Sequence, residues 1–391
     1  MNGCVWDGST TVNSSTTTTV VPRETRLRRR SIDDIQWAEI DTGSSRHFHI
    51  TGHCGNGTGC PAICRAFNDL LQREKARPIL QDEFCSCSCV SKWQNSMQQA
   101  GQIPQWPVTW LEGHDSPAGL ANGFQSWAVA GPTLERIHHH GRIVGSRFED
   151  DEAIYLALGD LRPSNTSASR PDQAKEVFEM MLEILAGSGM TFDQVVRTWL
   201  YMDHILEWYD AFNAVRNAFF EKHGIFDRLV PASTGIGCAH PAGTAMIAKL
   251  LAVLPKNGSV FEVKSPLQCP ATAYRSAFSR AAEVSLPSHR QLYISGTASI
   301  EPGGATVHVD DTRQQIELTM DVVHAILESR GMDWSDTTRA VAYLRHNDDR
   351  PLLRNWFASR QIANMPLVTV QSDVCRDNLL YEIEVDAIKL T

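Results

Sequence analysis

The strongest constraint on this chain is an internal repeat. From residue 46 onward one order of predicted elements recurs: a short strand ending in Gly, a helix, a second strand, a second helix and two further strands. In the last copy the first strand reads LYISGTAS and the final strand reads LLYEIEVDAIKL. Three positions of the middle copy return in the last copy at one constant spacing: Gly189, Arg197 and Tyr201 recur as Gly331, Arg339 and Tyr343.

The repeat divides the chain into three predicted units, residues 46–130, 145–255 and 270–391. The first unit is the most divergent, but it keeps the order of elements. Residues 1–35 carry a Thr/Ser-rich tract and the basic run RLRRR, with too little apolar surface to pack, and are predicted to be a disordered arm. Helical periodicity predicts helices over 61–75, 92–100, 172–187, 208–223, 312–329 and 351–362.

Each unit predicts a small α/β (α+β) fold. Its own two helices cover one face of its sheet, and the other face has to find a partner. Three copies in one chain can supply that partner to one another. We therefore expect a monomer in which the three units pack together, and larger assemblies remain open.

Composition narrows the class of protein. With 42% hydrophobic and 21% charged residues, the chain has the composition of a globular protein. A net charge of −9 argues against a nucleic-acid surface, which needs clustered cations. No apolar run approaches the ~20 residues of a membrane span, and no signal sequence is recognisable, so we expect a cytoplasmic protein without a membrane partner.

Six of the ten cysteines lie between Cys54 and Cys89. Cys60 and Cys64 are four residues apart on a predicted helix, and Cys85, Cys87 and Cys89 are predicted to alternate onto one face of a strand. Such spacing allows either soft metal ligands or buried, reduced thiols. Because it matches no standard zinc pattern, the second interpretation is favoured and no metal site is assigned.

The final strand carries the clearest candidate chemistry. Its period of two places Glu382, Glu384 and Asp386 on one face and apolar residues on the other. Carboxylates this close repel each other, so a partly buried one has a raised pKa and can donate a proton near neutral pH. The alternative is a polar face that is simply solvated.

Several motifs resemble the reactive intermediate deaminase (Rid, YjgF-like) superfamily, and most closely its chorismatase branch. They are PASTGIG at 231–237, FSRA at 278–281, LYISGTASI at 292–300, AYLR at 342–345 and DVCRDNLLYEIE at 373–384. The likeness covers roughly residues 145–391, and the first unit only by its pattern. Because Rid proteins are homotrimers with sites between subunits, the resemblance implies three chorismate-mutase-like units forming an intramolecular pseudo-trimer.

The resemblance implies a role for Glu382 as the acid that protonates the enolpyruvyl group of chorismate while pyruvate leaves. At the corresponding position the second unit is predicted to carry Ile247 and the first unit Gln125, so one cleft alone keeps its acid. The chorismatase family divides into members with and without a Cys at the position of Cys375, and the Cys-bearing type forms 3-hydroxybenzoate. Cys375 therefore joins the predicted catalytic residues, although a Cys is often only a small buried side chain.

A dicarboxylate substrate needs fixed cations, and guanidinium groups bind carboxylates in a bidentate manner. The predicted substrate contacts are Arg345, Arg280, Arg275, Tyr274 and Glu384. Arg345 is the preferred anchor, because it ends a strand in the unit that carries Glu382. Each arginine could instead form a structural ion pair.

Three functions fit these features. The first is a chorismatase-like lyase or hydrolase that acts on chorismate or a related small cyclic dicarboxylate, and the second is a Rid-type hydrolase or deaminase of another enamine or imine. The third is a catalytically silent binding or assembly protein. The arginine with which simple Rid deaminases hold a substrate carboxylate would fall near Leu367, where no Arg stands, so imine deamination is disfavoured. A small carboxylate is the expected partner, and no cofactor is implied.

Overall fold

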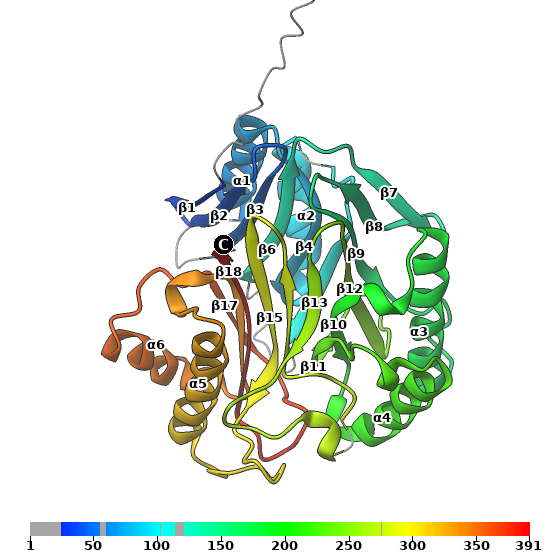
Figure 1. Ribbon diagram of the computed structural model, residues 1–391, viewed down its shortest axis with the longest axis vertical. Helices are drawn as coiled ribbons and strands as arrows, with labels where there is room; N and C mark the ends of the chain where they lie inside the picture. The colour runs from blue at the N-terminus through cyan, green and yellow to red at the C-terminus, as the bar shows by residue number, and fades with distance from the viewer. Residues whose placement is uncertain (1–24, 55–59, 102, 114–120, 275) are drawn as a thin grey trace, which may run out of the picture.

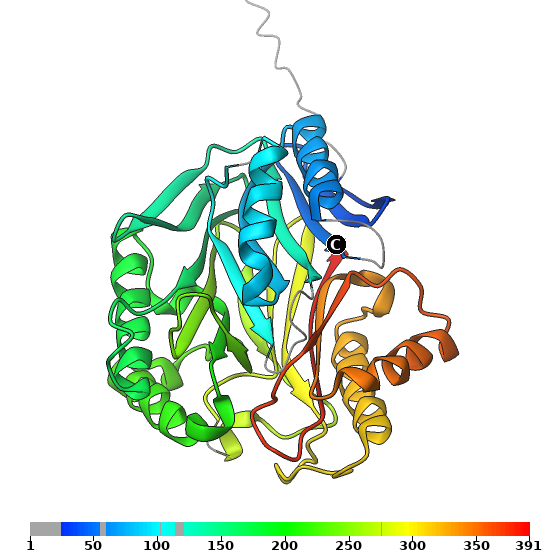
Figure 2. The same ribbon diagram turned by 180° about the vertical axis from the view of Figure 1, so that it is seen from behind.

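The computed structural model describes residues 25–54, 60–101, 103–113, 121–274 and 276–391. Its strands lie in the interior and its helices lie on the outside (Figures 1 and 2). The strands of these residues form two sheets, one of twelve strands and one of six. The protein is therefore a mixed α/β protein, as predicted, and its strands form large sheets.

The first segment, residues 25–130, contributes one half of the larger sheet. Its elements are β1 (Arg26–Ile32), β2 (Ile35–Asp41), β3 (Arg46–His53), α1 (Cys60–Glu74), β4 (Arg77–Cys85), the 3-10 turn η1 (Cys87–Cys89), α2 (Val90–Gln99), β5 (Val108–Gly113) and β6 (Ala121–Ala130). The predicted helices at 61–75 and 92–100 are confirmed to within two residues by α1 and α2.

The second segment, residues 131–255, contributes the other half of the larger sheet. Its elements are β7 (Glu135–His139), β8 (Arg142–Glu149), β9 (Ala153–Leu161), α3 (Arg170–Gly187), η2 (Phe192–Gln194), β10 (Val195–Met202), α4 (Ile205–Lys222), η3 (Ile225–Asp227), β11 (Ala232–Ala239) and β12 (Met246–Pro255). Helix α3 begins where it does because the Ser169 side chain accepts a hydrogen bond from the backbone N–H of Asp172, and Pro171 suits the first turn.

The third segment, residues 256–391, forms the six-stranded sheet. Its elements are β13 (Ser259–Val263), η4 (Ala271–Tyr274), β14 (Ala281–Ser285), β15 (His289–Ala298), α5 (Thr312–Ser329), η5 (Trp334–Asp336), β16 (Thr337–Leu344), η6 (Asn347–Asp349), α6 (Arg350–Ser359), β17 (Leu367–Gln371) and β18 (Tyr381–Leu390). Helix α5 has the predicted bounds, and the Asp311 side chain caps it by accepting from the N–H of Gln314.

The three segments share one strand order. It is β1-β2-β3-β6-β4-β5 in the first, β7-β8-β9-β12-β10-β11 in the second and β13-β14-β15-β18-β16-β17 in the third. In each segment the last pair is parallel. The larger sheet is continuous because β5 and β11 add a short antiparallel pairing. The repeat read in the sequence is thus also a repeat of sheet topology.

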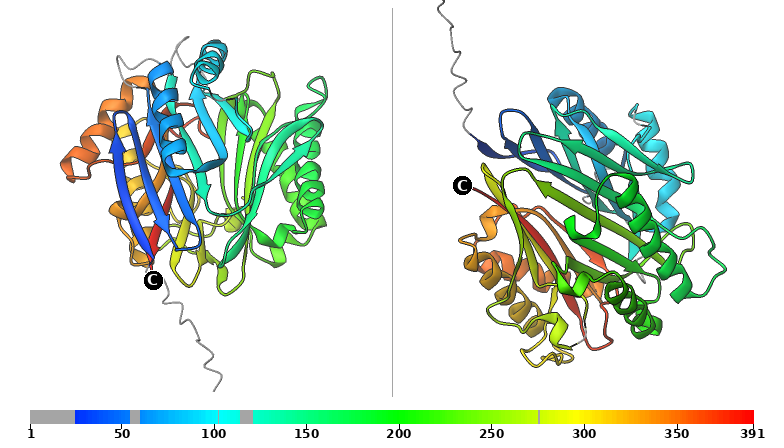
Figure 3. Two further views of the ribbon diagram at one scale, coloured as in Figure 1. Left: turned by 90° about the horizontal axis from the view of Figure 1, so that it is seen from above. Right: turned by 45° about the vertical axis from the view of Figure 1, so that its right-hand side comes forward.

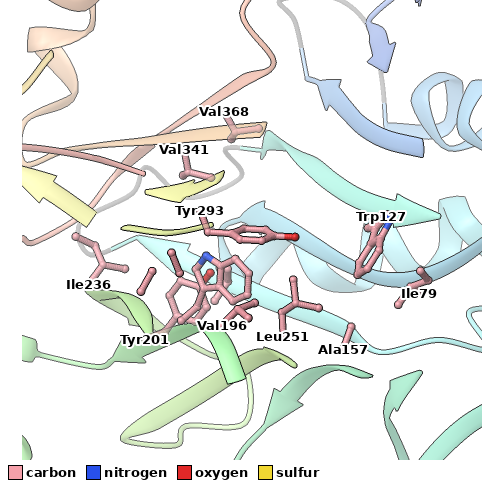
Figure 4. Close-up of a cluster of buried hydrophobic side chains, with 14 of the residues drawn as sticks. Ile79, Trp127, Ala157, Val196, Tyr201, Ile236, Leu251, Tyr293, Val341 and Val368 are labelled. Carbon is pink, nitrogen blue, oxygen red and sulfur yellow. The ribbon is translucent and has the colours of Figure 1, made fainter. Parts of the chain in front are cut away.

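Each segment packs against the other two. Strands β4 and β5 contact β8 and β9, β10 and β11 contact β14 and β15, and β16 and β17 contact β3 and β6. Figure 3 shows the helix pairs on three different sides, with the strands between them. A central hydrophobic cluster draws on all three segments, for example through Trp127, Tyr201 and Tyr293 (Figure 4). The inner sheet faces are therefore buried against one another.

The predicted disordered arm is too long. Residues 1–24 lie outside the described residues, but the basic run that follows them forms β1, which pairs with β2 along its whole length. Arg28 donates to the buried carboxylate of Glu39 at 3.1 Å, and Arg29 donates to the backbone carbonyl of Thr337 at 2.8 Å. The arginines are ordered because the neighbouring strand and the third segment supply acceptors for them.

The predicted units also begin too late. The prediction starts them at 46, 145 and 270, whereas the structure places β1 and β2 before the first start, β7 before the second and β13 before the third. These strands hydrogen-bond to the sheets that follow them, so they belong to the repeat.

The cysteine-rich region does not form the predicted strand face. Cys85 ends β4, whereas Cys87 and Cys89 lie in the turn η1. Burial and the nearby Glu112 raise the pKa of the Cys87 thiol to about 12, so it is protonated at neutral pH.

Within the described ranges no three His, Cys, Asp or Glu side chains are arranged to hold a metal ion. Within the same ranges no helix is long and apolar enough to cross a membrane.

Candidate active site

Strand β18 is buried on both faces, and its alternation sorts its side chains. Tyr381, Ile383 and Val385 pack under α5 in the hydrophobic core of the third segment. Glu382, Glu384 and Asp386 point to the other side and are also buried, with 5%, 0% and 7% of their surfaces exposed. The alternative of a solvated acidic face is therefore wrong, because neighbouring segments cover it.

Glu382 lies opposite Tyr343 of β16 and Ala298 of β15. The register of β15 shifts between Ile294 and Thr297, and Gly296 sits in that irregularity. A Cβ atom on Gly296 would collide with the carboxylate of Glu382. Any side chain in place of Gly296 would thus have to displace the carboxylate of the catalytic candidate.

A cavity of about 50 Å³ surrounds the Glu382 carboxylate at the junction of the second and third segments. Its lining includes Tyr209, Arg216, Ser233, Gly235, Phe278, Arg280, Gly296, Cys375, Arg376 and Glu382. This volume holds only about one or two water molecules. A ligand with a six-membered ring would therefore fit only after lining side chains move.

Burial has the largest effect on the pKa of Glu382. It raises the pKa of the Glu382 carboxyl to about 8, and the negative charge of Glu384 adds to the rise. Arg197 and Arg280 act in the opposite direction. The expected elevated pKa is thus present, and at neutral pH the group is mostly a protonated acid.

Glu384 was predicted to contact substrate, and the structure does not place it in this cavity. Its carboxylate is bound by Arg197 at 2.9 Å and by Arg339 at 2.6 Å, and the indole N–H of Trp199 donates to it at 3.2 Å. Burial alone would raise the pKa of Glu384, but Arg339 and Arg197 lower it below its usual value. Glu384 is therefore an ionised, enclosed carboxylate beside the cavity.

Cys375, which was predicted to be catalytic, lines the cavity. Its thiol is hydrogen-bonded with the hydroxyl of Tyr209. Burial and the nearby Glu382 raise the pKa of the Cys375 thiol to about 12. The sulfur is thus a neutral thiol at physiological pH, which suits a weak hydrogen-bonding partner and not a nucleophile.

The predicted arginines separate. Arg280 lines the cavity, and its Nε donates to the carbonyl of Cys269 at 3.0 Å. Arg345, the preferred anchor, does not line it: its guanidinium donates to the carbonyl of Asp377 and lies 3.6 Å from the carboxylate of Asp373. The Arg345 side chain thus turns to the loop before β18, and the structure does not bring it together with Glu382.

For two further residues predicted to contact the substrate, the structure describes no side chain. Arg275 lies outside the described residues. Tyr274 ends the turn η4, and the structure describes its backbone alone. Both remain predictions.

Two arginines on the cavity wall, Arg216 and Arg376, were not predicted from the sequence. Arg216 comes from α4 of the second segment, is 2% exposed and stacks on Phe212 at 5.3 Å. Arg376 follows Cys375 and donates to the carbonyl of Gly304 at 2.9 Å. A signal for Arg216 existed: it shares a helix face with Phe212 and Phe219, so helical periodicity buries it.

The equivalent positions in the other segments need one correction. The strand pairing aligns Tyr343 opposite Glu382 with Tyr201 opposite Ile247, as predicted. In the first segment the same position, opposite Phe84, is Gly123. Gln125 was the wrong residue: it pairs with Asp82, two residues before Phe84, and so corresponds to Glu384 and not to Glu382, but the first segment still has no acid at the position of Glu382.

Comparison with known proteins agrees with this architecture. Residues 126–252 match the family model described as "Chorismatase FkbO/Hyg5-like, N-terminal". A chorismatase from Streptomyces hygroscopicus is 29% identical over 219 residues, which are 50% of this chain and 62% of that protein. The chain thus spans less than two thirds of that relative. A 3-hydroxybenzoate synthase from the same organism is 27% identical over 275 residues, 63% of this chain and 77% of that protein.

A solved chorismatase structure matches the fold with a TM-score of 0.59 at 20% identity, covering 80% of this chain and 93% of that one. The structure of YyfA, a protein of the Rid family from Yersinia pestis, matches 33% of this chain at 18% identity with a TM-score of 0.28. The predicted resemblance to chorismatases is confirmed.

Proposed function

We propose that this protein is a chorismatase-like enzyme that releases pyruvate from chorismate or a closely related cyclic dicarboxylate. The observation that carries the proposal is a buried, protonated Glu382 in a cavity walled by arginines. Chorismatases among the relatives give the substrate class.

In the proposed reaction Glu382 delivers its proton to the terminal methylene carbon of the enolpyruvyl ether. The resulting oxocarbenium ion weakens the bond between the ether oxygen and the ring or accepts water at the former vinyl carbon, and pyruvate leaves. A carboxylic acid with a pKa of about 8 suits this step, because it is still protonated at neutral pH and is strong enough to protonate an activated vinyl ether.

The substrate carboxylates would be held by Arg216, Arg280 and Arg376. Each lines the cavity, and together they approach it from α4, from the residue before β14 and from the loop before β18. Guanidinium groups bind carboxylates with two parallel hydrogen bonds. A neutral Glu382 adds no repulsion toward a doubly charged ligand.

Cys375 is the basis for proposing the product. By resemblance to the Cys-bearing branch, and with a 3-hydroxybenzoate synthase among the relatives, we assign 3-hydroxybenzoate as the aromatic product. Chorismate contains the same atoms as pyruvate plus 3-hydroxybenzoate, so this outcome needs no oxidant or reductant. Because the ether oxygen leaves with pyruvate, the neighbouring ring hydroxyl would close onto the carbon that carried the ether, and its proton would return to Glu382. Opening of this epoxide at the original hydroxyl carbon, with loss of the proton from the former ether carbon, gives 3-hydroxybenzoate. The neutral thiol of Cys375 would contact the ring in these steps.

The same proposal includes the architecture. The three segments, with one strand order and mutual contacts, form an intramolecular pseudo-trimer in which one of three clefts is active. The second and first segments carry Ile247 and Gly123 where the third carries Glu382.

The decisive experiment is incubation with chorismate while pyruvate is measured with lactate dehydrogenase and the aromatic product by chromatography. We expect pyruvate and 3-hydroxybenzoate in equal amounts. Glu382→Gln keeps the shape and loses the transferable proton, so kcat should fall by about 10²- to 10⁴-fold with folding retained.

Circular dichroism and thermal unfolding of Glu382→Gln serve as the folding control. An unchanged kcat in this variant would remove Glu382 from the mechanism. If the parent protein releases no pyruvate from chorismate, the proposed activity is wrong, and the silent binding protein or a different Rid-type reaction takes its place.

A further inference from the structure

The enclosed carboxylate beside the cavity has an unusual set of partners. Glu384 follows Glu382 by two residues on β18, so both side chains point to the same side of the strand. Arg197, Arg339 and Trp199 all donate to Glu384, and both Glu384 and Arg197 have no exposed side-chain surface. A buried carboxylate with two guanidinium partners stays ionised, because each hydrogen bond stabilises its charged form.

This arrangement occurs once among the three segments. At the position of Glu384 the register places Lys249 in the second segment and Gln125 in the first. At the position of Arg339 it places Arg197 and Leu80. Among the three segments, a carboxylate bound by two arginines therefore occurs only on the strand that also carries an acid at the position of Glu382.

The contacts that Arg197, Arg339 and Trp199 make with Glu384 also join two segments. Arg197 and Trp199 belong to β10 of the second segment, whereas Arg339 and Glu384 belong to β16 and β18 of the third. The hydroxyl of Thr234 on β11 accepts from Arg197 at 2.6 Å and from the backbone N–H of Gly296 at 3.0 Å. The same contacts therefore hold the two walls of the cavity and the Glu384 charge in place.

Glu382 is faced by charged and titratable groups from several elements: Glu384 on β18, Arg197 on β10, Arg280 before β14, Tyr209 and Arg216 on α4, and Cys375 and Arg376 in the loop before β18. Arg197 and Arg280 favour an ionised Glu382, whereas burial and Glu384 favour its protonated form. Two negative charges on one buried strand face repel each other strongly because little water screens them.

Resting on the proposed function, we propose that Glu384 is a positioning residue that keeps the transferable proton on Glu382 through a buried negative charge held by Arg197, Arg339 and Trp199. Glu384 itself does not touch the substrate. Its role is to make the neighbouring acid a proton donor at neutral pH despite the cations that bind the substrate.

The test compares the pH profiles of Glu384→Gln and the parent protein. Activity requires protonated Glu382, so kcat falls as the pH rises through the pKa of that group. In Glu384→Gln this midpoint should move to lower pH by about one unit or more, which is a tenfold or greater loss of rate above the midpoint. A midpoint that stays in place while kcat merely declines would overturn the proposal.

Asp386→Asn is the matched control. It makes the same carboxylate-to-amide change on the same strand face, but Asp386 lines a different cavity, together with Lys249 and Trp127. Its midpoint should remain that of the parent. A shift in Asp386→Asn as large as that in Glu384→Gln would show a general effect of buried charge and contradict a specific role for Glu384.

A second readout does not depend on turnover. With ¹³C-labelled glutamate carboxyls, the resonance that disappears in Glu382→Gln is titrated by NMR in the parent and in Glu384→Gln. The same downward shift of the Glu382 pKa is expected. If chorismate is not turned over, the proposed function fails, yet this titration still supports or overturns the role of Glu384.

Removal of Glu384 alone leaves buried arginines with less compensation, and that variant can fail to fold. The double variant Arg197→Gln/Glu384→Gln removes both charges of one ion pair. Glu384 influences Glu382 more strongly than Arg197 does, so the midpoint should again move down, by a smaller amount. An upward or absent shift in the folded double variant would contradict the proposal.

Discussion

At the scale of single residues, the pKa values of three acids on one face of β18 shift in different directions. Burial raises the pKa of Glu382 to about 8 and raises the pKa of Asp386, whereas Arg339 and Arg197 lower the pKa of Glu384. Their local sequence context is nearly the same. The difference arises because arginines of two segments reach Glu384 directly and leave Glu382 in a small cavity.

The arginines provide the prediction at this scale. Arg376→Ala should weaken chorismate binding about 100-fold, because a bidentate charge-assisted contact is lost. Arg376→Lys should restore only part of the affinity, since an ammonium keeps the charge but not the planar fork. Binding is measured by calorimetry in the Glu382→Gln background, so that no turnover interferes.

Arg345→Ala is the control for this measurement. Its guanidinium binds Asp377 and Asp373 outside the cavity, so the dissociation constant should stay within a factor of about two of the parent value. Equal losses in Arg345→Ala and Arg376→Ala would mean that substrate binds in a different place.

At the scale of secondary-structure elements, the irregularity in β15 has a direct consequence for the site. It places Gly296 against the Glu382 carboxylate, where no side chain fits. The residues around Gly296 therefore determine both how β15 pairs with β18 and where the Glu382 carboxylate lies.

Gly296→Ala tests this coupling. The added methyl group must displace the Glu382 carboxyl, so kcat should fall at least about tenfold while the protein remains folded. Gly187→Ala, at the end of α3, is the control, because a Cβ there meets no atom within 4 Å. Steady-state kinetics with thermal unfolding of both variants check the prediction, and full activity of Gly296→Ala would contradict it.

At the scale of the whole molecule, the buried charges at the centre differ among the three segments. Lys249 of the second segment, which binds Asp82 of the first, stands at the position that Glu384 occupies in the third. Identical subunits around an axis cannot place opposite charges at equivalent positions. A single chain can, since each copy of the repeat can carry a different residue.

The corresponding prediction concerns the assembly. Because the inner sheet faces are already covered within one chain, the protein should be a monomer with one active cleft. Light scattering coupled to size exclusion should give the mass of a single chain at all concentrations tested. A particle of three chains would contradict the proposed intramolecular arrangement.

The sequence by itself determined the repeat, helices α1 to α6, the four strands of each predicted unit, the full extent of α5 and the position of Glu382, but not strands β1, β2, β7, β8, β13 and β14. The predicted features follow from periodicities of 2 and 3.6 residues and from local motifs. Only the tertiary structure decided that Arg216 lines the cavity and that Arg345 does not. It also decided that Gly123, and not Gln125, stands at the position of Glu382 in the first segment, and that the basic run forms strand β1. Each of these depends on partners from distant parts of the chain, whose contacts no local pattern records.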